Sequence, residues 1–109
     1  MAQSTFQSKR FEVTTTATDP TDWVIPVGGL KWGGVQFVGS HGLTGTYTAT
    51  VKQSIDGATP TAFSSAISTS SVPYMTTPMD LTGVGFLHVQ VTSGGGSGWI
   101  EAHFVGKTD

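Results

Sequence analysis

The chain has 109 residues, of which 37% are hydrophobic and 11% are charged, and its formal net charge at pH 7 is −2. This length suits one domain with one core. The five Lys and Arg residues are scattered, so no basic patch for nucleic acid is predicted. The absence of Cys excludes disulfides, thiolate metal sites and a Cys nucleophile. No apolar run is long enough to cross a membrane, so neither nucleic acid nor membrane is expected as a partner.

Along the chain, residues 1–9 are polar apart from Phe6 and are expected to form an extended N-terminal arm. After Asp19, fifteen Gly and five Pro leave few windows for a helix of three turns. Residues 10–109 are therefore predicted to form a single all-β domain, an antiparallel β-sandwich or jelly-roll-like fold of about eight strands. The expected strands cover residues 10–16, 23–27, 32–38, 46–51, 61–67, 72–75, 87–91 and 99–104.

The last two expected strands alternate apolar and polar residues, and a glycine-rich segment joins them. We expect them to pair as a hairpin with Val91 opposite Ile100. That register places His88 opposite His103 on the outward face, with Glu101 beside them. Two His and a carboxylate are ligands for Zn²⁺, but exposed polar cross-strand pairs are common, which favours a surface pair or one buried in a subunit contact. No cofactor is predicted.

The three Trp residues have different expected roles. Trp99 shares the polar face of its strand with Glu101 and His103, where an aromatic ring can stack on a sugar. Trp is also enriched at subunit interfaces, and we favour that role for Trp99. Trp23 and Trp32 adjoin apolar runs and are expected in the core. The candidate interface residues are thus Trp99, His88, His103 and Phe6.

The sequence predicts no catalytic site, and we expect the protein not to be an enzyme. It has no G-x-S-x-G nucleophile motif, and its glycine clusters are not followed by the Lys and Ser or Thr of a phosphate-binding loop. No close pair of carboxylates lies on the expected strands, as a glycosidase requires.

The predicted core consists of Phe37, Tyr47, Val51, Phe63, Leu87, Val89, Ile100 and Phe104.

A resemblance to a known group of proteins lies in residues 45–57, which read GTYTATVKQSIDG and are followed by Pro60 and Phe63. This segment resembles the pattern G-T-x-T-x-x-V-x-x-S-x-D-G of small tailed-phage virion proteins. Residues 85–94 and 98–106 are similar to the closing strands of β-sandwich decoration or tail accessory proteins. The resemblance covers about residues 30–106 and carries over no catalytic residue.

The resemblance implies a non-enzymatic virion protein, and we expect a capsid decoration (cement) protein that stabilises the phage head through contacts between subunits. The alternative is a phage tail or fibre accessory protein, or a carbohydrate-binding recognition module with a glycan as partner. The absence of Asn, a frequent sugar ligand, favours the cement protein over the carbohydrate-binding module. The expected partners are the major capsid protein or other virion proteins and further copies of the chain, most plausibly as a trimer. The first residues lack the features of a signal peptide, so we expect synthesis in the host cytoplasm and a final location in the virion.

Overall fold

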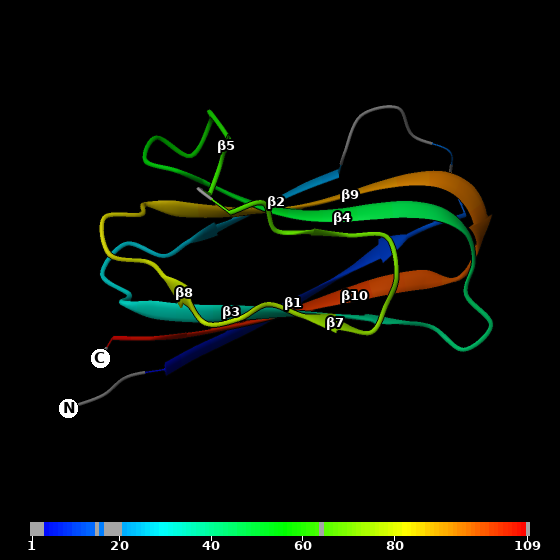
Figure 1. The fold of residues 1–109 in the computed structure, drawn as a ribbon, viewed down its shortest axis with the longest axis horizontal. Helices are drawn as coiled ribbons and strands as arrows, with labels where there is room; N and C mark the ends of the chain where they lie inside the picture. The colour runs from blue at the N-terminus through cyan, green and yellow to red at the C-terminus, as the bar shows by residue number, and fades with distance from the viewer. Residues whose placement is uncertain (1–3, 15, 17–20, 64, 109) are drawn as a thin grey trace.

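The computed structural model describes residues 4–14, 16, 21–63 and 65–108, which form two antiparallel sheets packed face to face (Figure 1). Sheet A has the order β1-β10-β3-β7, and β8 also pairs with β3. Its strands are β1 (Ser4–Glu12), β3 (Trp32–Gly39), β7 (Tyr74–Met75), β8 (Met79–Asp80) and β10 (Trp99–Lys107).

Sheet B has the order β2-β9-β4-β5, and β6 also pairs with β4. Its strands are β2 (Thr21–Pro26), β4 (Thr44–Ser54), β5 (Thr61–Ala62), β6 (Ser68–Thr69) and β9 (Phe86–Ser97). The predicted all-β sandwich is confirmed, with ten strands in the described part of the chain where about eight were expected. Four of the ten are only two residues long, including the remnants of the strands expected over residues 61–67 and 72–75. Within the described residues, no helix is long and apolar enough to span a membrane.

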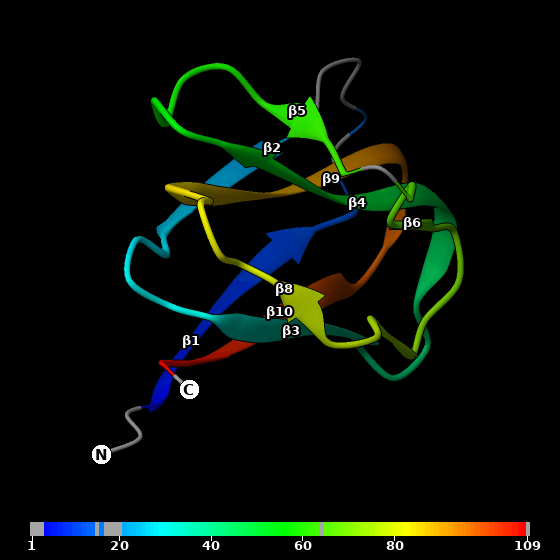
Figure 2. The ribbon, with the colours of Figure 1, turned by 60° about the vertical axis from the view of Figure 1, so that its left-hand side comes forward.

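The connections β1–β2, β2–β3, β3–β4 and β9–β10 each lead from one sheet to the other (Figure 2). The predicted hairpin between the last two strands is therefore wrong: β9 pairs with β2 and β4, whereas β10 pairs with β1 and β3. Val91 and Ile100 are both buried because the two strands point their apolar residues into the same core from opposite sheets. Gly98, with a φ of 108°, is the single residue between β9 and β10, and Gly95 and Gly96, with φ of 87° and 142°, lie just before it at the end of β9.

The segment expected as an N-terminal arm is also placed differently. Residues 4–9 form the first part of β1, which pairs with β10 from Ser4 opposite Lys107 to Glu12 opposite Trp99. The sequence signal for a strand was weak there because Phe6 is the sole large apolar residue of the segment, and it faces outward. Residues 1–3 of the expected arm lie outside the described residues.

The core lies between the sheets, where alternate residues of the long strands meet. Six of the eight predicted core residues are buried, and Tyr47 and Phe63 are partly buried against them. The fully buried large apolar side chains are Phe37, Phe104, Ile25, Leu81, Leu87, Ile100, Val13, Val27, Val35, Val51 and Val89.

Candidate functional site: an apolar groove on sheet A

The outer face of sheet A carries apolar side chains that the fold does not cover. Because side chains alternate along a strand, residues 33, 35 and 37 of β3 face the core and residues 32, 34 and 36 face outward. Trp32 is 42% exposed, Met75 71%, Val105 43% and Phe6 66%. These are four of the six exposed large apolar residues in the described chain. An exposed apolar cluster of this kind is a mark of a docking surface.

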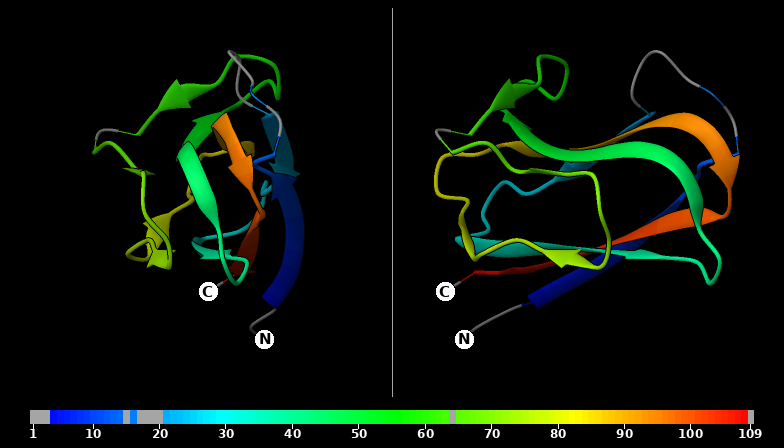
Figure 3. Two further views of the ribbon diagram at one scale, coloured as in Figure 1. Left: turned by 90° about the vertical axis from the view of Figure 1, so that its right-hand side faces the viewer. Right: turned by 45° about the vertical axis from the view of Figure 1, so that its right-hand side comes forward.

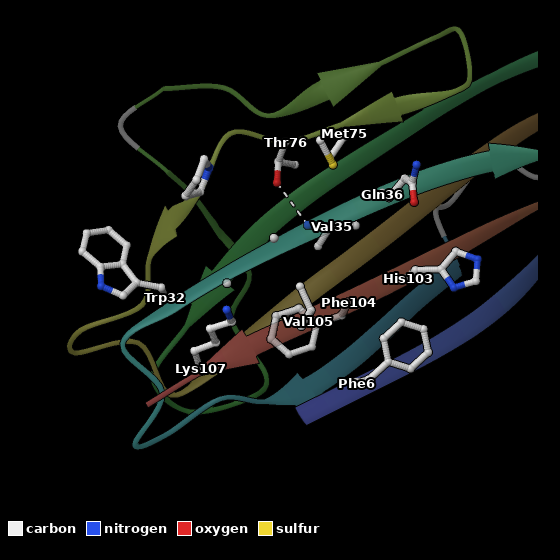
Figure 4. A pocket seen from close by; sticks show the side chains of 13 residues that line it. Phe6, Trp32, Val35, Gln36, Met75, Thr76, His103, Phe104, Val105 and Lys107 are labelled. Atoms are coloured by element: carbon white, nitrogen blue, oxygen red, sulfur yellow. Dashed lines mark hydrogen bonds between the residues drawn. The ribbon is translucent and has the colours of Figure 1, made fainter. Parts of the chain in front are cut away.

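The four side chains surround a groove of about 500 Å³ (Figure 4). Trp32 and Lys107 stand at one end, and Phe6 and His103 stand at the other. Gly34 contributes to the floor, where an added Cβ would meet only the Thr76 hydroxyl, 3.8 Å away. The missing side chain at this position keeps the groove open between β10 and the segment after β7.

One wall of the groove is tied to β3 by hydrogen bonds. The Val35 N–H donates to the Thr76 Oγ1 at 3.0 Å, and the Thr76 N–H donates to the Val35 carbonyl at 2.9 Å (Figure 4). Thr76 is 7% exposed, so its hydroxyl is a fixed part of the wall and is already used as an acceptor. The groove is therefore built before any ligand binds, which reduces the entropy cost of docking.

A row of polar and aromatic side chains on β1 and β10 leads into the groove. The Arg10 guanidinium lies 3.8 Å from the centroid of the Trp99 ring and 3.3 Å from the Glu101 carboxylate. The other oxygen of Glu101 contacts the His103 Nε2 at 2.9 Å. The His103 ring stacks on Phe6 with centroids 5.8 Å apart. These contacts hold the five side chains in a fixed order across two strands.

The opposite outer face, on sheet B, holds a buried polar cluster. His88 is 0% exposed, with its Nδ1 3.1 Å from the Asp22 carboxylate and its Nε2 2.7 Å from the Ser54 hydroxyl. A carboxylate only accepts, so Nδ1 carries the proton; in the neutral ring Nε2 then accepts from Ser54. The Gly57 N–H donates to the same Ser54 oxygen at 3.0 Å, and Gln90 reaches Asp22 at 3.4 Å.

These are the residue types of a Ser-His-Asp relay, but their setting is that of a structural clamp. Catalysis by such a relay needs an accessible hydroxyl beside free oxyanion donors. Here Ser54 is 6% exposed, and the nearby N–H of Gly57 is bonded to the hydroxyl itself. The cluster joins β2, β9 and β4 and holds down the loop that follows β4.

That loop has its own organising carboxylate, Asp56. It accepts from the Thr59 hydroxyl at 2.7 Å and from the Ala58 and Thr59 N–H groups at 2.9 Å each. These hydrogen bonds, the Thr59 hydroxyl first, lower the pKa of Asp56 from 3.8 to about 2. The Asp-Gly pair that follows β4 is therefore a polar loop fastened by its own side chain.

The structure brings together three of the four candidate interface residues. Trp99, His103 and Phe6 lie on the outer face of sheet A, whereas His88 is buried on sheet B. The expected grouping of His88 with His103 and Glu101 is wrong, because it required β9 and β10 to pair. Among the described residues, no three His, Asp or Glu side chains are grouped to hold a metal ion.

The sequence reasoning missed most of the groove. Trp32 was expected in the core, but Val35 and Phe37 take the inward positions of β3, and this parity turns Trp32 outward. The alternation within residues 32–38 was the signal that could have shown it. Met75 and Val105 gave no comparable signal, because their exposure depends on how β7 and β10 meet β3.

The fold and the groove together define a small antiparallel β-sandwich with an exposed apolar groove on one sheet. The crystal structure of the SPBc2 prophage-derived protein YomS is similar, with a TM-score of 0.66 over 94% of this chain and 95% of YomS. The two sequences are 18% identical, so the likeness shows a shared fold. No family model matches the chain, and no curated protein is significantly similar in sequence.

Proposed function

We propose that this protein is a non-enzymatic structural component of a phage particle, and that it is a capsid decoration protein held in place by the groove on sheet A. The observation that carries the proposal is the groove itself, where Trp32, Met75 and Phe6 are exposed around a preformed cavity. Apolar side chains of a neighbouring virion protein would bury this surface, and such burial contributes about 25 cal/mol per Å².

Two further observations support a phage origin. Residues 45–57 carry the pattern found in small tailed-phage virion proteins, and the structurally similar YomS is a prophage-derived protein. The proposal includes a location in the virion, with the major capsid protein as the expected partner.

The character of the groove favours a protein partner over a glycan. A sugar site needs several free polar groups around an exposed aromatic ring. Around Trp32 the lining is mostly carbon, and the hydroxyl of Thr76 is already bonded to Val35. Trp99, the ring considered for sugar stacking, has Arg10 against it.

The test is the position and copy number of the protein in purified particles, measured by cryo-electron microscopy and quantitative mass spectrometry. A decoration protein should be present in tens to hundreds of copies on the shell. A ring of roughly three to twelve copies at the tail would overturn the decoration role in favour of a tail accessory protein. Absence from particles would overturn the virion role.

A pair of variants tests the groove. Met75→Asp adds a charge at a groove residue that is 71% exposed, and it should abolish incorporation into particles. Ile55→Asp makes the same change at an 81% exposed apolar residue that does not line the groove, and it should leave incorporation unchanged. Equal incorporation of both variants would show that the groove is not the docking site.

A further inference from the structure

Strand β1 forms an open edge of sheet A. Within the described residues it pairs with β10 on one side and with no strand on the other. Figure 3 (left) shows β1 along the margin of the molecule. An open edge presents unpaired N–H and C=O groups to any strand that approaches it. Phe6, Ser8 and Arg10 on this edge are all exposed.

The hydrogen-bond pattern identifies which residues face the open side. The Val13 N–H donates to the Gly98 carbonyl at 3.1 Å, continuing the register in which Glu12 lies opposite Trp99. Bonded and non-bonded pairs alternate in an antiparallel ladder, so odd-numbered residues of β1 bond to β10. The even-numbered residues therefore direct their backbone groups to the open edge; they are Ser4, Phe6, Ser8, Arg10 and Glu12.

We propose that a second copy of this chain pairs with β1 along this edge, antiparallel, with the two-fold axis at Ser8. In this register, Phe6 of each copy lies opposite Arg10 of the other, and Glu12 lies opposite Ser4. No two like charges face each other, and about ten hydrogen bonds join the strands. The pair is isologous, so it closes as a dimer.

Charge and the length of strand that is paired select this register over those with the axis at Arg10 or Phe6. An axis at Arg10 would place two guanidinium groups opposite each other, which destabilises a strand pair. An axis at Phe6 would leave Arg10 and Glu12 opposite no residue of the described strand. Only the axis at Ser8 pairs the full length of β1 without such a conflict.

The remaining charge on β1 is also accommodated. Lysine on an edge strand usually discourages pairing, but Lys9 lies opposite Gln7 of the second copy in this register. The amide oxygen of Gln7 is an acceptor for the Lys9 ammonium. On the outer face, Phe6 lies opposite Arg10 of the other copy, whose guanidinium stays on the Trp99 ring of its own chain. The proposed two-fold pair differs from the trimer expected from the sequence, and the oligomeric state measured in solution distinguishes the two.

The first experiment is sedimentation velocity of the purified protein over a range of concentrations, which needs no phage particle and is independent of the proposed function. The protein should be a concentration-dependent dimer. Ser8→Pro removes a backbone N–H that points to the open edge, and an edge strand tolerates proline at such a position. This variant should therefore be a monomer. Ser8→Ala keeps the N–H and should remain dimeric. A wild type that stays monomeric at every concentration, or a folded Ser8→Pro variant that dimerises like Ser8→Ala, would overturn the proposal.

The second experiment tests the register and does not depend on the folding of the proline variant. The chain has no Cys, so a single introduced thiol is an unambiguous probe. At the two-fold axis, the Cα atoms of a bonded pair are about 5.5 Å apart, within the range of a disulfide. Ser8→Cys should therefore form a covalent dimer when oxidised with diamide. Glu12→Cys, whose two copies would be about 27 Å apart, should not. Cross-linking of Glu12→Cys in preference to Ser8→Cys would overturn the register.

Discussion

At the scale of single residues, the buried cluster around His88 shows how much one polar side chain can matter to stability. Replacing His88 with Ala removes a fully buried imidazole that bonds to the buried Ser54 hydroxyl and to the Asp22 carboxylate, whose side chain is 35% exposed. Leaving buried polar groups unpaired costs about 1–3 kcal/mol, and we expect a loss of that size in urea denaturation. His41→Ala, at an exposed turn, is the matched control and should change stability by less than about 0.5 kcal/mol. Equal stability of the two variants would contradict the clamp.

Asp56 gives the protein a pH-dependent contribution in the acid range. Its folded-state pKa is lowered from 3.8 to about 2 by hydrogen bonds from Thr59 and Ala58. A group with a lowered pKa stabilises the fold above its unfolded value, and this stability is lost as the pH falls from about 4 to about 2. Asp56→Asn should therefore lower the melting temperature at neutral pH and flatten its decline over that interval. The decline that remains includes Asp80, whose pKa is lowered by hydrogen bonds from Thr82.

The test of this contribution is to measure thermal melts of the wild type and of Asp56→Asn at several pH values. Parallel curves for the wild type and Asp56→Asn between about pH 4 and pH 2 would show that the carboxylate of Asp56 does not hold the loop in solution. The pH dependence should persist in a folded monomer, because the groups that donate hydrogen bonds to Asp56 come from within the same loop.

At the scale of elements, the pairing of β4 with β9 depends on glycines that let the two backbones approach closely. The register shifts between Gly45 and Tyr47, and a Cβ on Gly45 would lie 1.9 Å from the Gly95 carbonyl oxygen. Gly45 and Gly42 both have positive φ, but a Cβ on Gly42 would meet nothing within 4 Å. Gly42→Ala should thus cost only backbone strain, of about 1 kcal/mol, whereas Gly45→Ala should cost about 1–3 kcal/mol more. Urea denaturation of both variants measures the difference, and equal losses would mean that the bulge relaxes freely.

The sequence was most informative where a strand buries one face. Period-two alternation located the long strands β3, β4, β9 and β10, because alternate residues must enter a shared core. It could not tell that β9 and β10 belong to different sheets, since Leu87 and Phe104 point inward in either arrangement. Whether β9 and β10 pair with each other depends on the path of the glycine-rich segment between them. Such a sequence is compatible with a hairpin or with a crossing between the sheets.

The candidate site was predictable in the same partial way. Trp99 and His103 were found as surface residues because they occupy the polar positions of an alternating strand, and Phe6 was noted as the apolar residue of a polar N-terminal segment. The groove was not found, because it arises where four strands, β1, β3, β7 and β10, come together and where Gly34 omits a side chain. His88 has the outward parity that was predicted, yet its side chain is fully buried and bonds to Asp22 of β2 and Ser54 of β4. Local alternation cannot show that an outward side chain is buried by its surroundings.

At the scale of the whole molecule, the groove and the open edge of β1 lie on the same sheet. If two copies join along β1, their A sheets become one continuous sheet, and the outer faces of both copies point in the same direction. The dimer then presents two grooves, around Met75 of each copy, to a single surface. A shell of repeated subunits offers repeated sites, so both grooves can be occupied at once.

Two simultaneous contacts should make the dimer bind particles much more tightly than one groove alone, because the second contact forms at a high effective concentration. The folded Ser8→Pro monomer should therefore bind stripped particles roughly 10²-fold more weakly than Ser8→Ala. Met75→Asp should remain a dimer but lose binding altogether, since it spares the edge and alters the groove. Binding of each variant to particles lacking the native protein, measured by co-sedimentation, separates the two surfaces. Equal affinity of Ser8→Pro and Ser8→Ala would mean that only one groove of each dimer reaches the shell.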